Sequence, residues 1–486
     1  MDSSQERKKV FAGFFWKFSE RISGQLISFV ISVILARILM PEDYGAVAMV
    51  QLFITFANVF INSGLATSLI QKKDADQLDF STILYCSILF SGILYTITYF
   101  AAPLVSVFFR IEQLTSIIRV YGLILFLNAF NSIQSAYASR HMLFKKFFVS
   151  ALGSSLLSGG IGIFMAYHGF GVWALVFQAM SSTFFNMLIL NYTIQWRPKL
   201  MFSWTRAKGL LNFGWKILCA DFIGTVFNEL RQIIIGRFYT PADLAFYNRG
   251  KHFAQLIAHN VDSTMSAVLF PAMANHSDNP EQIKSMTRRA ISTSSYLLYF
   301  CMCTLAIIAE PLIKILLTEK WIESVFYLQM ICLAHLFGSI SITNIQALKA
   351  IGRSDAVLKL EIIKKPVYLI LVLAAIPLGV KAIVVTMPIY SVYALFVNMT
   401  PNKKILNYSR LEQLRDLAPA TLLSIGMAAV LYPFTFLIAN PYILLLTQCL
   451  TAAVFYVSIS HLFKVESFSY CKNLLLNKFK KPNKKS

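Results

Sequence analysis

Polar and charged side chains recur at helical spacing inside apolar stretches of this chain. Lys17, Arg21 and Gln25 lie four residues apart, so in a helix they share one face. A similar row recurs two hundred residues later, with an acid in the place of Arg21; it consists of Asp221, Thr225, Asn228 and Gln232. Ionisable groups inside a membrane span are costly, so such rows cannot face lipid and must meet one another or water.

A third polar row lies in the stretch 244–272, and it completes the candidate site. Its members are Arg249, His252, Gln255, His259 and Asp262. The cations suit an anionic substrate, because arginine binds phosphate oxygens through paired hydrogen bonds; they are Lys17, Arg21, Arg231, Arg249 and Lys251. Uncharged groups expected to line a hydrated cavity are Gln25, Asn228, Gln255, His252 and His259. Candidates to carry a coupling proton or sodium ion are Asp221, Glu229 and Asp262. Ion pairing between helices without transport remains an alternative for each residue.

No metal, cofactor or catalytic site is expected. His252 and His259 would need a closed set of further ligands to hold a metal, and no Cys or His pair stands at zinc-site spacing. The sequence has no phosphate-binding glycine loop, no nucleophile elbow and no zinc motif. Its longest polar segments run to roughly twenty residues, too short for a soluble catalytic or ATP-driven domain. We therefore do not expect an enzyme.

Apolar stretches of membrane-spanning length must carry these rows. Apolar residues make up 57% of the 486 residues and charged residues 14%. A span needs ~20 apolar residues, and windows without Asp, Glu, Lys or Arg are 44–71, 80–109, 120–139, 290–309, 324–348 and 382–402. Two double-length windows, 147–196 and 417–463, are expected to break at His168-Gly169 and Asn440-Pro441. Weaker spans near 14–38, 211–236, 244–272 and 357–378 bring the prediction to an all-α integral membrane protein of about 14 helices.

Lysine and arginine gather on every second connection between these spans. The opposite connections hold only Arg37, Arg110, Arg237, Lys314, Lys320 and Lys381. The positive-inside rule then places both termini in the cytoplasm, and the first span is expected to be retained as a helix. The net charge of +21 is thus mainly a topology signal. It is spread over short loops, so no nucleic-acid partner is expected.

One helix end recurs at an offset of two hundred residues. The matching residues are Arg37, Pro41 and Asp43 in the first copy and Arg237, Pro241 and Asp243 in the second. Pro can stop one helix and Asp can cap the next. Six helices separate the copies, which indicates a parallel repeat. The prediction is two six-helix lobes around a central cavity, 1–200 and 201–402, followed by helices 13 and 14 with a basic tail, 403–486.

Two segments near the N-terminus resemble the opening of the polysaccharide transporter family. They read LARILMPEDYG from Leu35 and NSGLATSLIQ from Asn62, and Phe213-Gly214 and Tyr247-Asn248-Arg249 are similar as well. This family comprises bacterial lipid-linked oligosaccharide flippases of the O-antigen and colanic-acid type. It belongs to the multidrug/oligosaccharidyl-lipid/polysaccharide exporter superfamily, with the multidrug and toxin extrusion transporters and the peptidoglycan lipid flippase.

The resemblance implies a flippase of the bacterial inner membrane. Its substrate would be an undecaprenyl-pyrophosphate-linked oligosaccharide repeat unit, moved by ion-coupled alternating access for O-antigen, capsule or exopolysaccharide synthesis. It also implies membrane lipids, H+ or Na+, a polysaccharide polymerase and the chain-length machinery as partners, with cavity cations at Lys17, Arg21 and Arg249. Three other readings stay open: a multidrug antiporter, a membrane glycan polymerase or ligase, and a membrane scaffold without transport.

Overall fold

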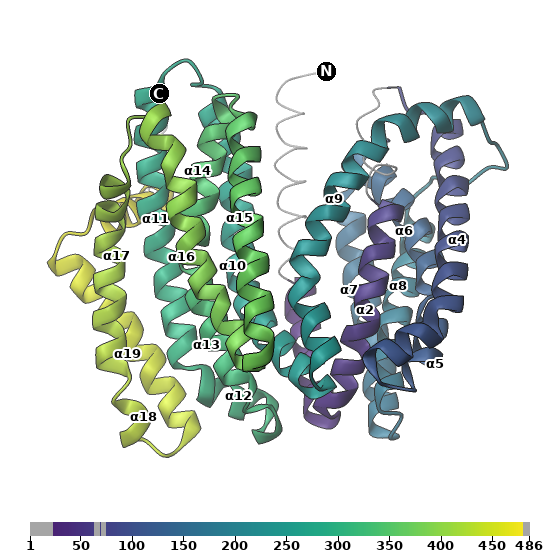
Figure 1. Ribbon diagram of the computed structural model, residues 1–486, viewed down its shortest axis with the longest axis horizontal. Coiled ribbons are helices and arrows are strands. Elements are labelled where there is room, and N and C mark those ends of the chain that lie inside the picture. Colours follow the sequence, from purple (N-terminus) through teal and green to yellow (C-terminus); the bar gives the residue numbers. More distant parts are fainter. Residues whose placement is uncertain (1–22, 63–68, 70–73, 480–486) are drawn as a thin grey trace. The chain divides into compact units, whose positions relative to one another are not determined.

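The computed structural model describes residues 23–62, 69 and 74–479, and every long regular element among them is a helix (Figure 1). The chain divides into two compact units, Met1–Ala245 and Phe246–Ser486. This division does not test the predicted repeat lobes, whose boundaries stay a prediction. Within the described residues, the predicted all-α membrane fold is confirmed.

The helices of unit 1 are Ser23–Ile38, α2 (Pro41–Asn62), α4 (Gln77–Phe109), α5 (Leu114–Tyr121), α6 (Ile124–Arg140), α7 (Phe144–Tyr167), α8 (Val172–Thr193) and α9 (Trp204–Phe238). Next comes α10 (Pro241–Ala274), whose first residues still belong to unit 1. Unit 2 continues with α11 (Pro280–Ile307), α12 (Ala309–Leu317), the 3-10 turn η1 (Glu319–Trp321), α13 (Ser324–His335), α14 (Gly338–Ala350), α15 (Ser354–Ala375) and η2 (Ile376–Leu378). It ends with α16 (Val380–Ile405), α17 (Arg410–Leu431), α18 (Phe434–Leu437), α19 (Pro441–Leu462) and α20 (Glu466–Phe479).

In the described part of the chain, ten helices are long and apolar enough to cross a membrane. An eleventh is α9, if its two segments, bent by 45°, form one span. The weaker predicted spans fall on Ser23–Ile38, α9, α10 and α15, and α10 and α15 carry charged side chains along their length. The number fourteen therefore stays a prediction.

Both predicted breaks in the double-length windows are confirmed. After α7 the chain turns through Gly169 and Gly171, which have φ of 77° and 51°. Such left-handed backbone favours glycine, because a Cβ would be strained there. Before α19 the side chain of Asn440 accepts hydrogen bonds from the backbone of Tyr442 and Ile443, which caps the helix.

The helices that begin at the repeated proline, α2 and α10, start alike. The Asp43 carboxylate accepts a hydrogen bond from the Met40 backbone N–H at 3.2 Å. The Asp243 carboxylate accepts the equivalent bond from Thr240 at 3.1 Å. Each aspartate thus caps its helix from the third position, which satisfies a donor that the helix leaves free. The predicted capping role of both residues is confirmed.

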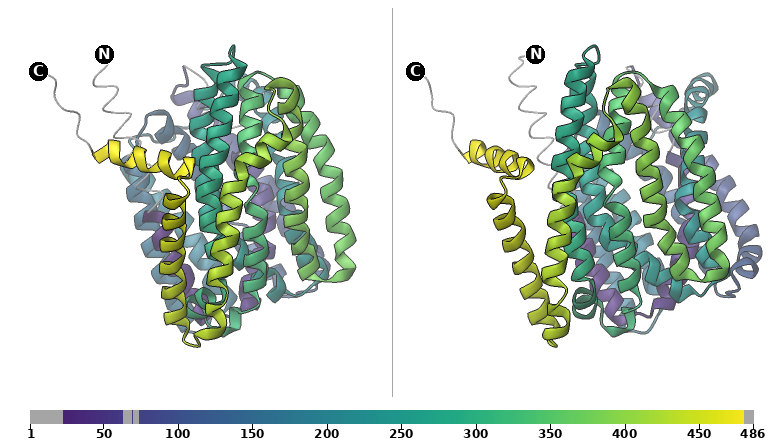
Figure 2. Two further views of the ribbon diagram at one scale, coloured as in Figure 1. Left: turned by 90° about the vertical axis from the view of Figure 1, so that its left-hand side faces the viewer. Right: turned by 60° about the vertical axis from the view of Figure 1, so that its left-hand side comes forward.

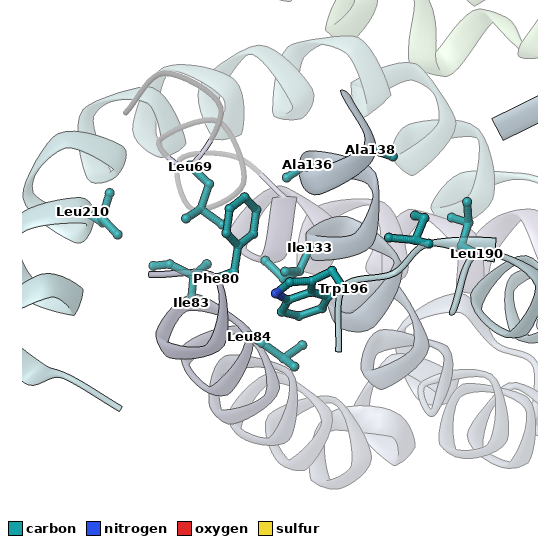
Figure 3. Packing of buried hydrophobic residues seen from close by; sticks show 11 residues of the cluster. Leu69, Phe80, Ile83, Leu84, Ile133, Ala136, Ala138, Leu190, Trp196 and Leu210 are labelled. Carbon is teal, nitrogen blue, oxygen red and sulfur yellow. The ribbon is translucent and has the colours of Figure 1, made fainter. Parts of the chain in front are cut away.

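A buried apolar cluster joins one end of α4, α6, α8 and α9 in unit 1 (Figure 3). Its members are Leu69, Phe80, Ile83, Leu84, Ile133, Ala136, Ala138, Leu190, Ile194, Trp196 and Leu210. The Phe80 ring lies 6.0 Å from the Trp196 ring, which is 5% exposed. Burying one such side chain contributes ~1.5–3 kcal/mol, so the cluster holds the start of α9 in place.

Beside this cluster Arg206, in the first turn of α9, binds two acids at the start of α4. Its guanidinium lies 2.5 Å from the Asp76 carboxylate and 3.2 Å from that of Asp79, which is fully buried. The hydrogen bond from Arg206 is the main reason that the pKa of Asp76 falls to about 2. The pair ties α9 to α4.

In unit 2, a charge pair ties α17 to α11. In this pair the earlier helix carries the arginine and the later helix carries the acid. Here Arg288 on α11 donates two hydrogen bonds to Asp416 on α17, at 2.8 and 2.9 Å, and Tyr408 donates a third at 2.7 Å. Further in, the buried amide of Asn344 donates to Gln413 at 2.9 Å, linking α14 to α17. The last helix, α20, runs across the end of α19 (Figure 2, yellow).

Candidate functional site

In unit 1, α9 carries the second polar row. Asp221 and Asn228 are exposed, whereas Thr225 and Gln232 are half-buried. The Thr225 hydroxyl donates to the Asp221 carbonyl oxygen at 2.8 Å and is thus satisfied within the helix. A carboxylate and an amide therefore remain exposed along two turns of α9, a face that hydrocarbon would not tolerate.

Two charged residues beside this row differ in burial. Arg231 is 8% exposed, while Glu229 is half-buried and accepts a hydrogen bond from the Gln232 side chain. Arg231 lies seven residues before Phe238, the last residue of α9. At ~1.5 Å per residue this places it about 10 Å from that end.

Of the first polar row only Gln25 can be located. It is half-buried near the start of the helix Ser23–Ile38. Lys17 and Arg21 lie outside the described residues. The structure therefore does not place these two predicted cations.

Arg249 lies where α10 packs against α13 and η1 in unit 2. Its guanidinium carbon is 5.0 Å from the centre of the Trp321 ring, and the arginine is 7% exposed. Next to it, a Cβ on Gly250 would come within 2.7 Å of the Leu328 backbone nitrogen. Glycine thus lets α10 approach α13 closely, and the indole face offers the cation an electrostatic partner.

The rest of the third row lies on a more open side of α10. His252, Gln255 and His259 are all exposed. They follow one another at helical spacing and so share one face. Lys251 is half-buried, with its ammonium 6.0 Å from the Tyr247 ring. The predicted row is thus split, because Arg249 packs inward while the imidazoles and the amide face outward.

Asp262 lies in the C-terminal half of α10. Its Oδ1 atom is buried and has no hydrogen-bond partner among the residues that the structure describes. A Cβ on Gly338, the first residue of α14, would lie 4.0 Å from both carboxylate oxygens. An unsatisfied buried carboxylate oxygen is costly, which favours binding of a proton or a small cation at this carboxylate.

His335, at the end of α13, is a neighbour of the site that sequence reasoning missed. It lies close enough to Lys251 for their charges to interact. The signal available was a single imidazole in the window 324–348, which is otherwise free of charged side chains. Trp321 was missed as well, since nothing in its local sequence indicates that an arginine packs on its ring.

Some membrane charges are simply paired with one another. Lys364 on α15 is 5% exposed, and its ammonium lies 2.6 Å from the carboxylate of Glu361, three residues earlier. Lys365 lies 3.8 Å from the same acid. For these three residues of α15, structural ion pairing accounts for the charges. Within the described residues, no group of three or more His, Cys, Asp or Glu is placed to hold a metal.

Comparison with known sequences gives one family match. The model described as "Polysaccharide biosynthesis protein" matches residues 34–326. One curated relative is the succinoglycan biosynthesis transport protein ExoT of Rhizobium meliloti (strain 1021). It is 23% identical over 339 residues, which cover 70% of this chain and 68% of ExoT.

Comparison with solved structures gives the fold. The lipid II flippase MurJ, in an inward closed conformation, matches with a TM-score of 0.76 over 93% of this chain and 98% of that chain, at 14% identity. An inward-facing multidrug resistance transporter of the MATE family and MOP superfamily matches with a TM-score of 0.60 over 79% of this chain and 94% of that chain, at 16% identity. The fold is therefore that of the MurJ and MATE transporters.

Proposed function

The chain belongs to the polysaccharide biosynthesis protein family, whose model matches more than half of it, and from this we propose that it flips a lipid-linked oligosaccharide across the bacterial inner membrane. The substrate is an undecaprenyl-pyrophosphate-linked repeat unit used for O-antigen, capsule or exopolysaccharide. ExoT is a succinoglycan biosynthesis transport protein, and this relationship together with the MurJ-like fold supports the proposal. Both termini lie in the cytoplasm, and membrane lipids, a polymerase and the chain-length machinery are the expected partners.

The exposed polar face of α10 is the observation that carries the proposal. His252, Gln255 and His259 lie along one side of a helix that is long enough to cross the bilayer. Since hydrocarbon does not tolerate such a face, it borders water. A hydrated face along a helix of membrane-spanning length is what a glycan needs for passage, because its hydroxyl groups must stay hydrogen-bonded.

The predicted membrane cations are proposed to bind the pyrophosphate. The structure describes three of them, Arg231, Arg249 and Lys251. We propose the same role for Lys17 and Arg21, which lie outside the described residues. Arg231 and Arg249 are each at most 8% exposed, so water screens their charges less than it screens a surface lysine. The prenyl tail stays in lipid while the two repeat halves expose the glycan to each side in turn.

Asp262 is our candidate for ion coupling, with Asp221 and Glu229 as weaker ones. Its unpartnered Oδ1 can take up a proton or a sodium ion and release it when the surroundings change. Asp262→Asn should abolish the dependence of flipping on an imposed ion gradient while leaving exchange without a gradient in place. Gradient dependence equal to that of the wild type would exclude Asp262 from coupling.

The experiment that tests flipping uses proteoliposomes with a fluorescent prenyl-pyrophosphate-linked oligosaccharide. A glycosidase added outside digests only the outer leaflet, so flipping raises the digested fraction from about half towards completion. We expect Arg231→Gln to slow this by tenfold or more, because a charged hydrogen bond contributes ~1.5–3 kcal/mol. The double variant Gln255→Leu/His259→Leu should slow it by a similar factor, because it removes two neutral hydrogen-bonding groups of ~0.5–1.5 kcal/mol each. Arg353→Gln, in an exposed connection before α15, is the matched control.

The other candidate functions would give different results in the same proteoliposomes. A multidrug antiporter would move cationic dyes against a proton gradient and leave the glycan lipid in place. A polymerase or ligase would lengthen or transfer the glycan in the purified system. Digestion that stays at half with the wild-type protein would overturn the proposal.

A further inference from the structure

A polar pocket of about 480 Å³ lies between α11 and α20, outside the candidate transport site. Ten residues line it: Ser285, Arg288, Arg289, Ser292, Thr293, Glu466, Ser467, Ser469, Tyr470 and Asn473. Two guanidinium groups, five hydroxyl-bearing Ser and Thr side chains and an amide are thus gathered with a single carboxylate. Such a lining, rich in hydrogen-bond donors, suits a phosphate group.

A tight turn joins α19 to α20. Lys464 has a φ of 48°, and the backbone N–H of Val465 bonds to the Ser460 carbonyl oxygen at 3.0 Å. This is the hydrogen-bond pattern that ends a helix with one left-handed residue. Phe468 then packs on an apolar cluster with Tyr296 and Tyr456, so the pocket is built by packed elements.

The two arginines of the pocket are not equivalent. Arg288 donates two hydrogen bonds to Asp416, so its charge is already compensated. Arg289 is exposed and lies 5.4 Å from the centre of the Tyr470 ring. Among the described residues no carboxylate pairs with Arg289. Its guanidinium therefore retains hydrogen-bond donors for an anion.

The position of the pocket along α11 places it at the membrane boundary. Arg289 is the last charged residue before the stretch 290–309, which contains no Asp, Glu, Lys or Arg. On the other side α20 follows α19, a membrane-length helix that ends at Leu462. The chain then continues into a tail with Lys478, Lys480, Lys481, Lys484 and Lys485. Basic segments next to a span attract anionic lipid.

We propose that the pocket between α11 and α20 binds the phosphate headgroup of an anionic phospholipid from the adjoining leaflet. Arg289 holds the phosphate, Ser292 and Ser467 supply hydroxyl donors, and Tyr470 keeps the guanidinium in place. The acyl chains extend beside the apolar part of α11. Glu466 at the rim repels the headgroup and so limits its affinity. This site is independent of the proposed flipping function.

The test titrates the full-length protein in detergent with phosphatidylglycerol and counts bound lipids by native mass spectrometry. We expect a bound phosphatidylglycerol that Arg289→Gln weakens about tenfold, the loss that one charged hydrogen bond produces. Arg289→Lys should retain most of the binding, and Glu466→Gln should tighten it. Lys472→Gln is the matched control, because Lys472 is exposed on the same helix but does not line the pocket.

Competing ligands identify the source of the phosphate. Equal binding of phosphatidylcholine, or displacement of the lipid by millimolar inorganic phosphate, would overturn the proposal. So would unchanged affinity in both Arg289→Gln and Glu466→Gln. Circular dichroism of each variant checks folding, and the opposite sign expected for Glu466→Gln keeps the test valid if Arg289→Gln is not folded.

Discussion

The helices α2 and α10 begin in the same way and then diverge in chemistry. Both start at a proline, and in both an aspartate at the third position accepts a hydrogen bond from the preceding backbone N–H. Eight residues after the proline, α2 has Met49, fully buried, and α10 has Arg249, 7% exposed. The same position of the predicted repeat is thus buried in both copies, and it is a methionine in one and a cation in the other.

The two positions thus share burial and differ in charge. Met49 lies against Gly236 of α9 within unit 1, whereas Arg249 lies on the Trp321 ring within unit 2. A buried cation costs free energy that a methionine does not. Whether Arg249 serves binding or packing on Trp321 is decided by exchanging the two side chains.

The largest effect is expected for Met49→Arg, which places a cation at the position of α2 that has none. A Cβ on Gly236 would already lie 3.4 Å from the methionine methyl group, so the site is apolar and tight. We expect a loss of several kcal/mol and little folded protein, measured by fluorescence-detected gel filtration. Met49→Leu should cost less than ~1.5 kcal/mol. Normal folding of Met49→Arg would mean that the two positions are not different environments.

The next largest effect is expected for the reverse exchange, Arg249→Met, and it is measured as the rate of flipping. The methionine at the matching position of α2 predicts that the fold tolerates it, so the melting temperature in detergent should change little. Flipping should fall tenfold to a hundredfold if the cation binds phosphate, since a charged hydrogen bond contributes ~1.5–3 kcal/mol. Full flipping with a lowered melting temperature would assign Arg249 to packing on Trp321 instead.

A smaller effect is expected where the copies differ in backbone spacing. A Cβ on Gly45 of α2 would lie 1.9 Å from the Pro241 carbonyl oxygen, whereas the matching position of α10 already holds Ala245. Gly45→Ala should therefore destabilise the protein by ~1–3 kcal/mol, measured by thermal unfolding. Gly24→Ala, where a Cβ would meet nothing within 4 Å, is the control. Equal melting temperatures would show that the close approach is not required.

The smallest effect should come from the shared caps. Asp43→Ala and Asp243→Ala each remove an acceptor for an N–H that the helix leaves free, at a cost of ~0.5–2 kcal/mol. Asp243 also accepts from the Thr240 hydroxyl at 2.7 Å, so its loss should be the larger of the two. A larger loss for Asp43→Ala in chemical unfolding would contradict this order.

Much of the fold could be predicted because a membrane span depends only on the composition of one continuous stretch of the chain. The charge-free windows, the breaks at His168-Gly169 and Asn440-Pro441, and the capping aspartates each depend on a few neighbouring residues. The arrangement of the site could not be predicted in the same way. Arg249 is turned from His259 by about 80° around the helix, and only the packing of α13 and η1 decides that this side is buried. Trp321 and His335 belong to elements that are distant in sequence from Arg249. Asp76 is likewise distant in sequence from its partner Arg206.

The pair between Arg206 and Asp76 responds to pH only in strong acid. Because the pKa of Asp76 falls from 3.8 to about 2, its contribution to stability is complete above pH 4 and is lost only as the pH drops towards 2. The link between α4 and α9 therefore stays charged at neutral pH, and a change in pH around neutrality does not loosen it.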